Sequence, residues 1–378
     1  MTSRADRSGW LLVALSLAVL TAFLIGLSWQ RPPVMALRHV LFAAGVLPLI
    51  LGAMLYFVPV LTRSLPAHGA ILLIPPAAFA LGIGVVFGLS GHVEALPLLA
   101  GGVLLLVCIE IAWMLRRRAR VLGAPHPGID WYVYALIALV LALAMIVSRA
   151  FRPEYWAAAR NLHLHLNLFG FLGLTAIGTL RVLLPTALGE ADPASSPFLR
   201  RQLPVAASGA LAIAVGAAVW PPLAMLGALA WLWTGVQLLF ALRKWRGRWL
   251  HRHAASTGLA AAVLGWVLLL LAGMAHAVGY VASDALFAVL IFAFLLPLVT
   301  GATGYLLPVW RWPGRATPAQ AQMRHRLTQF SAARVGAFWF SAATGIAGYD
   351  YAAVPGALAL ALYLLQVLLA FVRVRVTD

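Results

Sequence analysis

The chain has 378 residues, of which 63% are hydrophobic and only 10% are charged, and its mean hydropathy is +0.95. This composition excludes an ordinary soluble domain and indicates an integral membrane protein. The single cysteine, Cys108, excludes a disulfide framework and a cysteine metal site. The net charge of +17 comes from basic residues in short runs between apolar segments, so we expect these residues to set membrane topology and expect no nucleic-acid partner.

Apolar segments long enough to cross a bilayer follow one another along the whole chain. In order they cover residues 10–28, 37–62, 70–88, 95–115, 131–150, 158–187, 204–222, 224–242, 256–280, 283–308, 330–347 and 353–372. The first follows a short basic start, and no small-residue cleavage site comes after it, which favours a retained anchor over a signal peptide. We therefore predict an all-α membrane protein with twelve transmembrane helices in a single integral membrane domain, 1–378.

The basic residues predict how this bundle is oriented. Most of the 27 lysines and arginines, including the run Arg116, Arg117 and Arg118, lie on one side of the membrane if the amino terminus is cytoplasmic. Cytoplasmic loops carry such an excess of positive charge. With an even number of helices, both termini are expected in the cytoplasm, and a bacterial inner membrane is the expected location.

A short motif recurs three times and predicts internal repeats. Residues 52–59 read GAMLYFVP, 178–185 read GTLRVLLP and 301–308 read GATGYLLP, so that a glycine is followed seven residues later by a proline. The same offsets align His165 with His39 and with Ala288. Twelve helices then divide into three pseudo-symmetric four-helix repeats, about 1–125, 126–252 and 253–378.

Five histidines fall on the predicted outer side, and the four that lie in or at the ends of predicted helices are the candidate ligands: His39, His163, His165 and His276; His92 lies in a loop. Imidazole is a common ligand of transition metals and of haem iron, whereas a lone membrane histidine more often bonds a backbone carbonyl. His163 and His165 point about 200° apart on a helix, while His163 and Asn167 share a face. We expect His39, His163 and His165 to include the metal ligands. His165 is preferred as the inward ligand because the repeat places it on His39, with His163 at a neighbouring site.

Outer arginines cluster just before these histidines, against the usual topology rule. They are Arg31, Arg38, Arg149, Arg152 and Arg160. An anion such as haem propionate or a lipid headgroup would balance them, and ordinary ion pairs with Glu94, Glu154 or Asp350 are the alternative.

The stretch HLHLNLFGFLGLTAIGTLRVLLP, in a chain of repeated four-helix groups, resembles the helix-six region of haem-copper oxidase subunit I relatives. The nearest in character are short cbb-type and nitric-oxide-reductase-like membrane proteins and NnrS-type haem and copper proteins linked to nitric oxide stress. The resemblance implies that His39 binds haem iron and that His165 or His163 binds copper. It also implies that the outer arginines Arg31, Arg38, Arg149 and Arg152 hold haem propionates.

The chain departs from that family at two helices. Segments 204–222 and 283–308 contain no histidine, where the family has copper and haem ligands, and only His276 lies in the approach to the second of these. Oxygen reduction is therefore not expected, and enzyme status stays open, leaning towards no catalysis. We expect a haem- or copper-binding membrane protein with a redox, nitric-oxide-stress or accessory role, whose partners besides the lipid bilayer are further membrane subunits or a small gas ligand. The alternative is a transporter or channel for a small solute or metal ion with a histidine-lined outer cavity.

Two charged residues inside predicted helices need partners. We expect Glu110 to extend towards the arginine run that follows it, although a proton-relay role is the functional alternative. Arg181 is expected to bond a carbonyl freed by Pro185.

Overall fold

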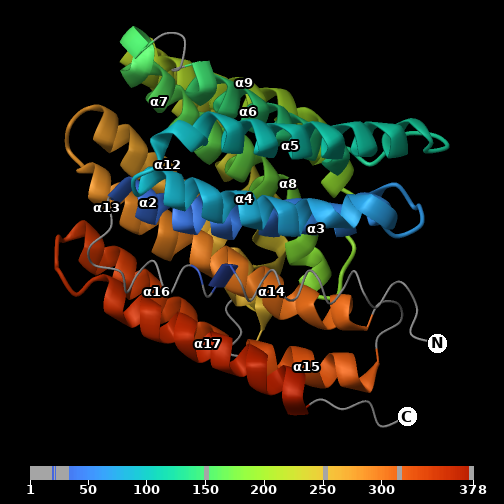
Figure 1. The fold of residues 1–378 in the computed structure, drawn as a ribbon. Helices are drawn as coiled ribbons and strands as arrows, with labels where there is room; N and C mark the ends of the chain where they lie inside the picture. The colour runs from blue at the N-terminus through green and yellow to red at the C-terminus, as the bar shows by residue number, and fades with distance from the viewer. Residues whose placement is uncertain are drawn as a thin grey trace. The chain divides into compact units, whose positions relative to one another are not determined.

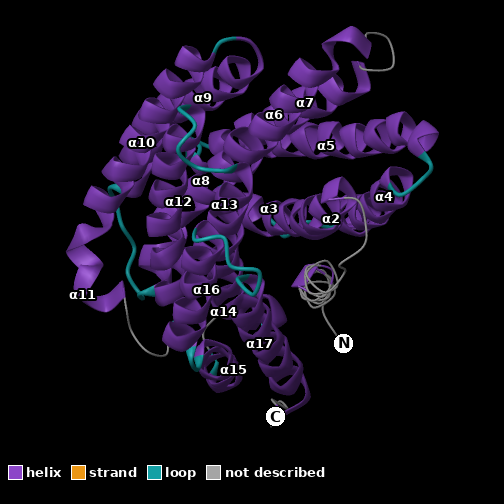
Figure 2. Cartoon of the chain, turned by 90° about the vertical axis from the view of Figure 1, so that its left-hand side faces the viewer, coloured by secondary structure: helices purple, strands orange, loops and turns teal. Residues whose placement is uncertain are grey.

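The computed structural model describes residues 19, 20, 22, 34–148, 153–249, 254–312 and 317–373. Every regular element in these ranges is a helix, and none is a strand (Figure 2). Within the described part of the chain, ten helical stretches are long and apolar enough to cross a membrane. The predicted class, an all-α integral membrane protein, is thus confirmed.

The ten spanning stretches follow the predicted segments closely. They are Met35–Leu61, Gly69–Leu89, Val93–Ala119, Gly128–Ser148, Trp156–Ala187, Ser195–Val219, Pro221–Arg248, Ala255–Ala277, Ser283–Arg311 and Ala353–Ala370. The predicted first helix, 10–28, lies almost entirely outside the described residues. The predicted eleventh, 330–347, corresponds to α16 (Ser331–Ile346), whose 16 residues are slightly fewer than the roughly 17–25 of a typical membrane-spanning helix.

Contacts divide the chain into two compact units. The amino-terminal unit consists of the described residues within 14–178 and 196–230, and the carboxy-terminal unit consists of the described residues within 179–195 and 231–378. In chain order, the helices between residues 34 and 242 are α2 (Val34–His39), η1 (Val40–Val46), α3 (Leu47–Leu61), η2 (Gly69–Leu73), α4 (Ile74–Leu89), η3 (Val93–Ala95), α5 (Leu96–Ala119), α6 (Gly128–Ser148), η4 (Pro153–Tyr155), α7 (Trp156–His165), η5 (Leu166–Gly173), α8 (Leu174–Ala187), α9 (Ser195–Val219) and α10 (Pro221–Leu242).

Small residues bring the helices of the amino-terminal unit close together, as is usual in lipid, where packing replaces the hydrophobic driving force. A Cβ added at Gly82 of α4 would lie 2.2 Å from the Ala43 carbonyl oxygen of η1. A Cβ added at Gly170 of η5 would lie 2.5 Å from Cβ of Ala138 on α6. Helices α4 and α5 lie side by side in the same unit (Figure 1). The segments that carry His39 and His163 are therefore anchored by tight neighbours.

The carboxy-terminal unit continues with η6 (Arg243–Trp245), α11 (Arg246–Trp249), α12 (Ala255–Ala277), α13 (Ser283–Ala288), η7 (Val289–Leu295), α14 (Leu296–Arg311), α15 (Pro318–Thr328), α16 and α17 (Ala353–Arg373). Helix α12 packs on η7 and α14, and α16 runs beside α17 (Figure 1). Gly265 of α12 meets the backbone of Ala293, because a Cβ there would lie 1.9 Å from its carbonyl oxygen. Trp266, on the same helix, packs its ring on Trp231 and Phe294.

Three spanning helices share an irregular segment. Each changes from α to π geometry and back, in η1, η5 and η7, and these π segments begin directly after His39, His165 and Ala288. Further along the same helices, Pro59, Pro185 and Pro308 lie within α-helical turns. Isolated π turns inside α-helices occur frequently at functional sites. The irregularity thus falls where the aligned sequence motif placed the candidate ligands.

Candidate metal centre

His39 and His163 lie beside each other in the amino-terminal unit. Their ring centres are 6.4 Å apart and the ring planes are inclined by 14°. His39 ends α2, and His163 lies in the last turn of α7, each just ahead of a π segment. Two imidazoles that are far apart in the sequence are therefore brought to one place.

Both rings are held by a backbone carbonyl at the same nitrogen. Nδ1 of His39 lies 2.8 Å from the carbonyl oxygen of Met35, and Nδ1 of His163 lies 3.0 Å from that of Ala142. A carbonyl oxygen only accepts, so Nδ1 carries the hydrogen in each ring. Each neutral imidazole then has its lone pair at Nε2, which is the form that binds a metal while its other nitrogen is oriented by a carbonyl.

The surroundings of His163 hold its ring in place. Asn167, one turn later on the same face, donates from Nδ2 to the His163 carbonyl at 2.7 Å, and this amide nitrogen lies 3.4 and 3.5 Å from the two ring nitrogens. Asn161 donates to the carbonyl of Ala217 on α9 at 3.0 Å, which ties α7 to a second helix. Ala142 is fully buried and small, so α6 approaches closely enough for its carbonyl to reach the ring.

The spacing of the two rings fits a shared metal ion. Two imidazoles bound through Nε2 on opposite sides of one ion, in a linear arrangement, would have ring centres about 6 Å apart, since each metal–nitrogen bond is about 2.0–2.1 Å and each nitrogen lies about 1 Å from its ring centre. The observed 6.4 Å agrees with this value. The described residues contain no group of three or more His, Cys, Asp or Glu side chains able to hold an ion, so the candidate centre consists of two imidazoles.

The other predicted ligands have different surroundings. His165 bonds the carbonyl of Asn161, one turn back on its own helix, at 2.8 Å and stacks on Phe169 with ring centres 6.2 Å apart. His276, in the carboxy-terminal unit, is exposed and lies 2.6 Å from the carbonyl oxygen of Val281. The ring beside His39 is thus that of His163, whereas the sequence alone favoured His165. Both rings lie in regular α7, which turns them to different sides.

The predicted propionate arginines can be followed only in part. Arg38 directly precedes His39 in α2 and is partly buried. Arg31, Arg149 and Arg152 lie outside the described residues. Ala288, which the motif aligns with His39 and His165, packs against Gly345 of α16, where an added Cβ would lie 2.6 Å from that of Ala288. This close contact explains why a small residue, and no histidine, occupies the third position.

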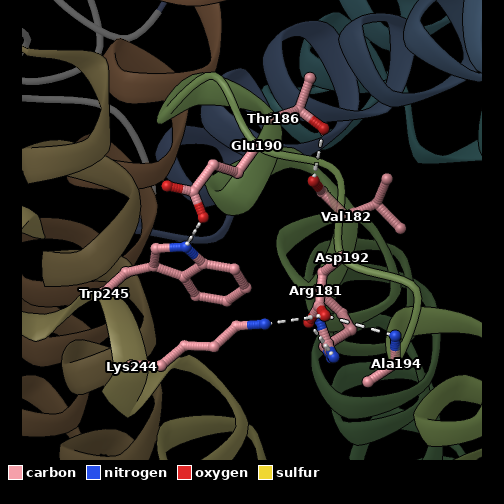
Figure 3. A network of polar contacts seen from close by, with 8 residues as sticks. All are labelled: Arg181, Val182, Thr186, Glu190, Asp192, Ala194, Lys244 and Trp245. Atoms are coloured by element: carbon pink, nitrogen blue, oxygen red, sulfur yellow. Dashed lines mark hydrogen bonds and ion pairs between the residues drawn. The ribbon is translucent and has the colours of Figure 1, made fainter.

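A charged network that the sequence did not predict lies in the carboxy-terminal unit (Figure 3). Asp192 accepts from Arg181 at 2.5 Å and from Lys244 at 3.0 Å. The side chains of Arg181 and Asp192 are 1% and 2% exposed. The sequence predicted a carbonyl partner for Arg181, and the structure gives it a buried carboxylate as a partner. Burial raises the pKa of Asp192, but hydrogen bonds from Lys244 and Arg181 outweigh it and hold that pKa below its ordinary value.

A second carboxylate joins the same region to η6 and α11. The indole of Trp245 donates to Glu190 at 2.5 Å, and Arg248 forms an ion pair with Glu190 (Figure 3 shows the indole contact). These two hydrogen bonds lower the pKa of Glu190 from its ordinary value. Gly189, with a φ of +80°, allows the chain to leave α8 and turn towards these partners. Lys244 and Trp245 lie more than fifty positions after the carboxylates that they contact, so no local sequence pattern predicts these contacts.

Comparison of the sequence with models of known protein families gave no match, and comparison with curated proteins gave no relative. The functional argument for this chain therefore rests on the geometry of its own residues.

Proposed function

We propose that this integral membrane protein binds a haem iron or a copper ion through His39 and His163. The observation that carries the proposal is the near-parallel pair of imidazoles, 6.4 Å apart, each with Nδ1 held by a carbonyl. A haem iron or copper ion bound there would supply one-electron redox chemistry or binding of a small gas. The apolar surroundings would tune its potential.

The proposed class is that of the haem-copper oxidase-like membrane proteins, in a non-oxidase role in redox chemistry, nitric-oxide stress or assembly, in a bacterial inner membrane. The proposal includes twelve helices, cytoplasmic termini and three repeats. The recurrence of a π segment one residue after His39, His165 and Ala288 supports the repeats, because the three positions were aligned by sequence offsets alone. Membrane partner subunits and a small gas ligand belong to the same proposal.

Visible absorbance and metal analysis of the detergent-purified protein test the proposal. The protein should carry or take up haem with a Soret band, or bind copper in an equal molar amount. Replacing His39 or His163 by alanine should abolish either signal. The matched control is His92→Ala, because that ring lies in a loop and its side chain is 75% exposed.

Cofactor binding should also stabilise the fold, since a ligand that binds only the folded state shifts unfolding by mass action. Identical melting curves with and without added haem and copper would contradict a specific site. Binding that survives both His39→Ala and His163→Ala would place the cofactor elsewhere. If liposomes containing the protein passed a solute and neither cofactor bound, the transporter alternative would replace this proposal.

A further inference from the structure

A fully buried carboxyl group lies in the amino-terminal unit and plays no part in the candidate metal centre. Glu110 lies in α5, inside the spanning stretch Val93–Ala119, and its exposed fraction is 0%. Both carboxyl oxygens are buried and have no hydrogen-bond partner among the residues that the structure describes. A polar group in this situation costs free energy and calls for an explanation.

Glu110 lies on the packed face of α5. The buried residues of α5 are Ala100, Val103, Val107, Glu110 and Met114. Steps of three and four residues place them on one side of the helix. The other four are apolar, so Glu110 lies at an interior position where a leucine or methionine would ordinarily pack.

The arginine run after Glu110 does not neutralise it. The expectation that its side chain extends towards this run is wrong, because the carboxyl is buried and unpartnered. Arg117, about 10 Å further along the helix axis, donates instead to Ser64 at 2.5 Å. Arg118 forms an ion pair with Asp130 at 2.7 Å. These two arginines of the run thus have other partners.

An ionised carboxylate without a partner would cost far more free energy in an apolar interior than a neutral acid would. We propose that Glu110 is a proton-binding site, whose exchangeable proton neutralises the carboxyl inside the membrane-spanning part of the amino-terminal unit. Intramembrane carboxyls in proton relays have the same character. The inference does not depend on the metal centre, so the failure of either leaves the other unaffected.

Dicyclohexylcarbodiimide provides the first test on the full-length protein in detergent. A carboxyl oxygen bonds to the central carbon of the reagent while the acid proton moves to one of its nitrogens. Where water is excluded, the acyl group then moves from this oxygen to a nitrogen of the reagent, the carbon–oxygen bond to the acyl group breaks, and a stable N-acylurea adduct remains. Mass spectrometry should find the adduct on the peptide that contains Glu110, and Glu110→Gln should lack it. Glu94, with a side chain 75% exposed, is the internal control and should remain unlabelled. A wild-type protein unlabelled at Glu110 would overturn the proposal.

Infrared difference spectra of wild type and Glu110→Gln provide the second test. The wild type should show the carbonyl stretch of an un-ionised acid, and this band should shift on transfer to D₂O because the proton exchanges. A carboxylate band in its place, or an acid band that fails to shift, would contradict a proton-binding site. If the glutamine variant does not fold, the carbodiimide adduct of the wild type alone decides the question.

Discussion

Replacing Asp192 by asparagine tests whether the buried ion pair stabilises the region after α8. Asparagine has nearly the same shape, so the substitution removes the charge with little change in packing. Arg181 would keep its charge at 1% exposure but would lose the carboxylate that lies 2.5 Å away. Lys244, whose side chain is 52% exposed, would turn to water.

The expected loss of stability follows from the burial of Arg181 and Asp192. Removing one member of a buried ion pair costs about 3–5 kcal/mol, because the remaining charge is left uncompensated. Asparagine still offers one acceptor oxygen, and the exposed Lys244 lets water approach. We therefore expect a loss near the lower end, about 3 kcal/mol in the free energy of unfolding.

Equilibrium unfolding by SDS in mixed micelles, followed by tryptophan fluorescence, measures this loss. The matched control is Arg248→Gln, which breaks the exposed pair with Glu190 and should cost much less, because water screens such pairs. A stability of Asp192→Asn equal to wild type, or an equal loss in the control, would refute the reasoning.

The same measurement at low pH checks the electrostatic cause. The pKa of Asp192 is lowered in the folded protein from its ordinary 3.8, so the stabilisation is complete above that value. It declines as the pH falls through the folded-state pKa. The difference between wild type and Asp192→Asn should therefore stay constant from neutral pH to about pH 5 and shrink in stronger acid.

Two further predictions concern packing and the metal centre. Gly265→Ala would place a Cβ 1.9 Å from the Ala293 carbonyl oxygen and should lower the free energy of unfolding by about 1–3 kcal/mol. Gly273→Ala, on the same helix with nothing within 4 Å of the added Cβ, should leave that free energy unchanged or raise it by up to about 1 kcal/mol. SDS unfolding of both variants measures the difference, and the reverse order of stabilities would contradict the prediction. Asn167→Ala should weaken haem or copper binding roughly 10- to 100-fold, because it frees the His163 ring from a supporting amide, and an unchanged affinity in a ligand titration would argue against that role.

The spanning helices were predictable because hydropathy is a local property. Segment 158–187 matches Trp156–Ala187, while Ser195–Val219 begins nine residues before predicted segment 204–222, since its first turns are polar. Helix α15 was missed because it is polar and basic overall, although it buries Met323 and Leu327. Its start does carry a local signal: Thr317 accepts from the backbone N–H of Gln320 at 3.1 Å, as an N-cap does.

The candidate site was predictable in its residue types but not in its pairing. Helical geometry showed that His163 and His165 face different sides, and the repeat offset then favoured His165. Which of them meets His39 depends on how α7 is rotated against its neighbours, and that rotation comes from contacts such as the one with Ala142. Contacts of this kind join positions far apart in the chain, so no periodic pattern in the sequence predicts them.

The π segments change the direction in which side chains project from their helices. Each i→i+5 turn holds more residues than an α turn, so the part of the helix before the segment is rotated relative to the part after it. Converting η1 to continuous α bonding at the same chain length would rotate His39 by roughly 100° around the axis relative to Gly52 and Pro59, because a π turn holds about one residue more than an α turn. The direction of the imidazole is therefore set by a stretch that carries no ligand, and the backbone geometry there is as constrained as side-chain identity.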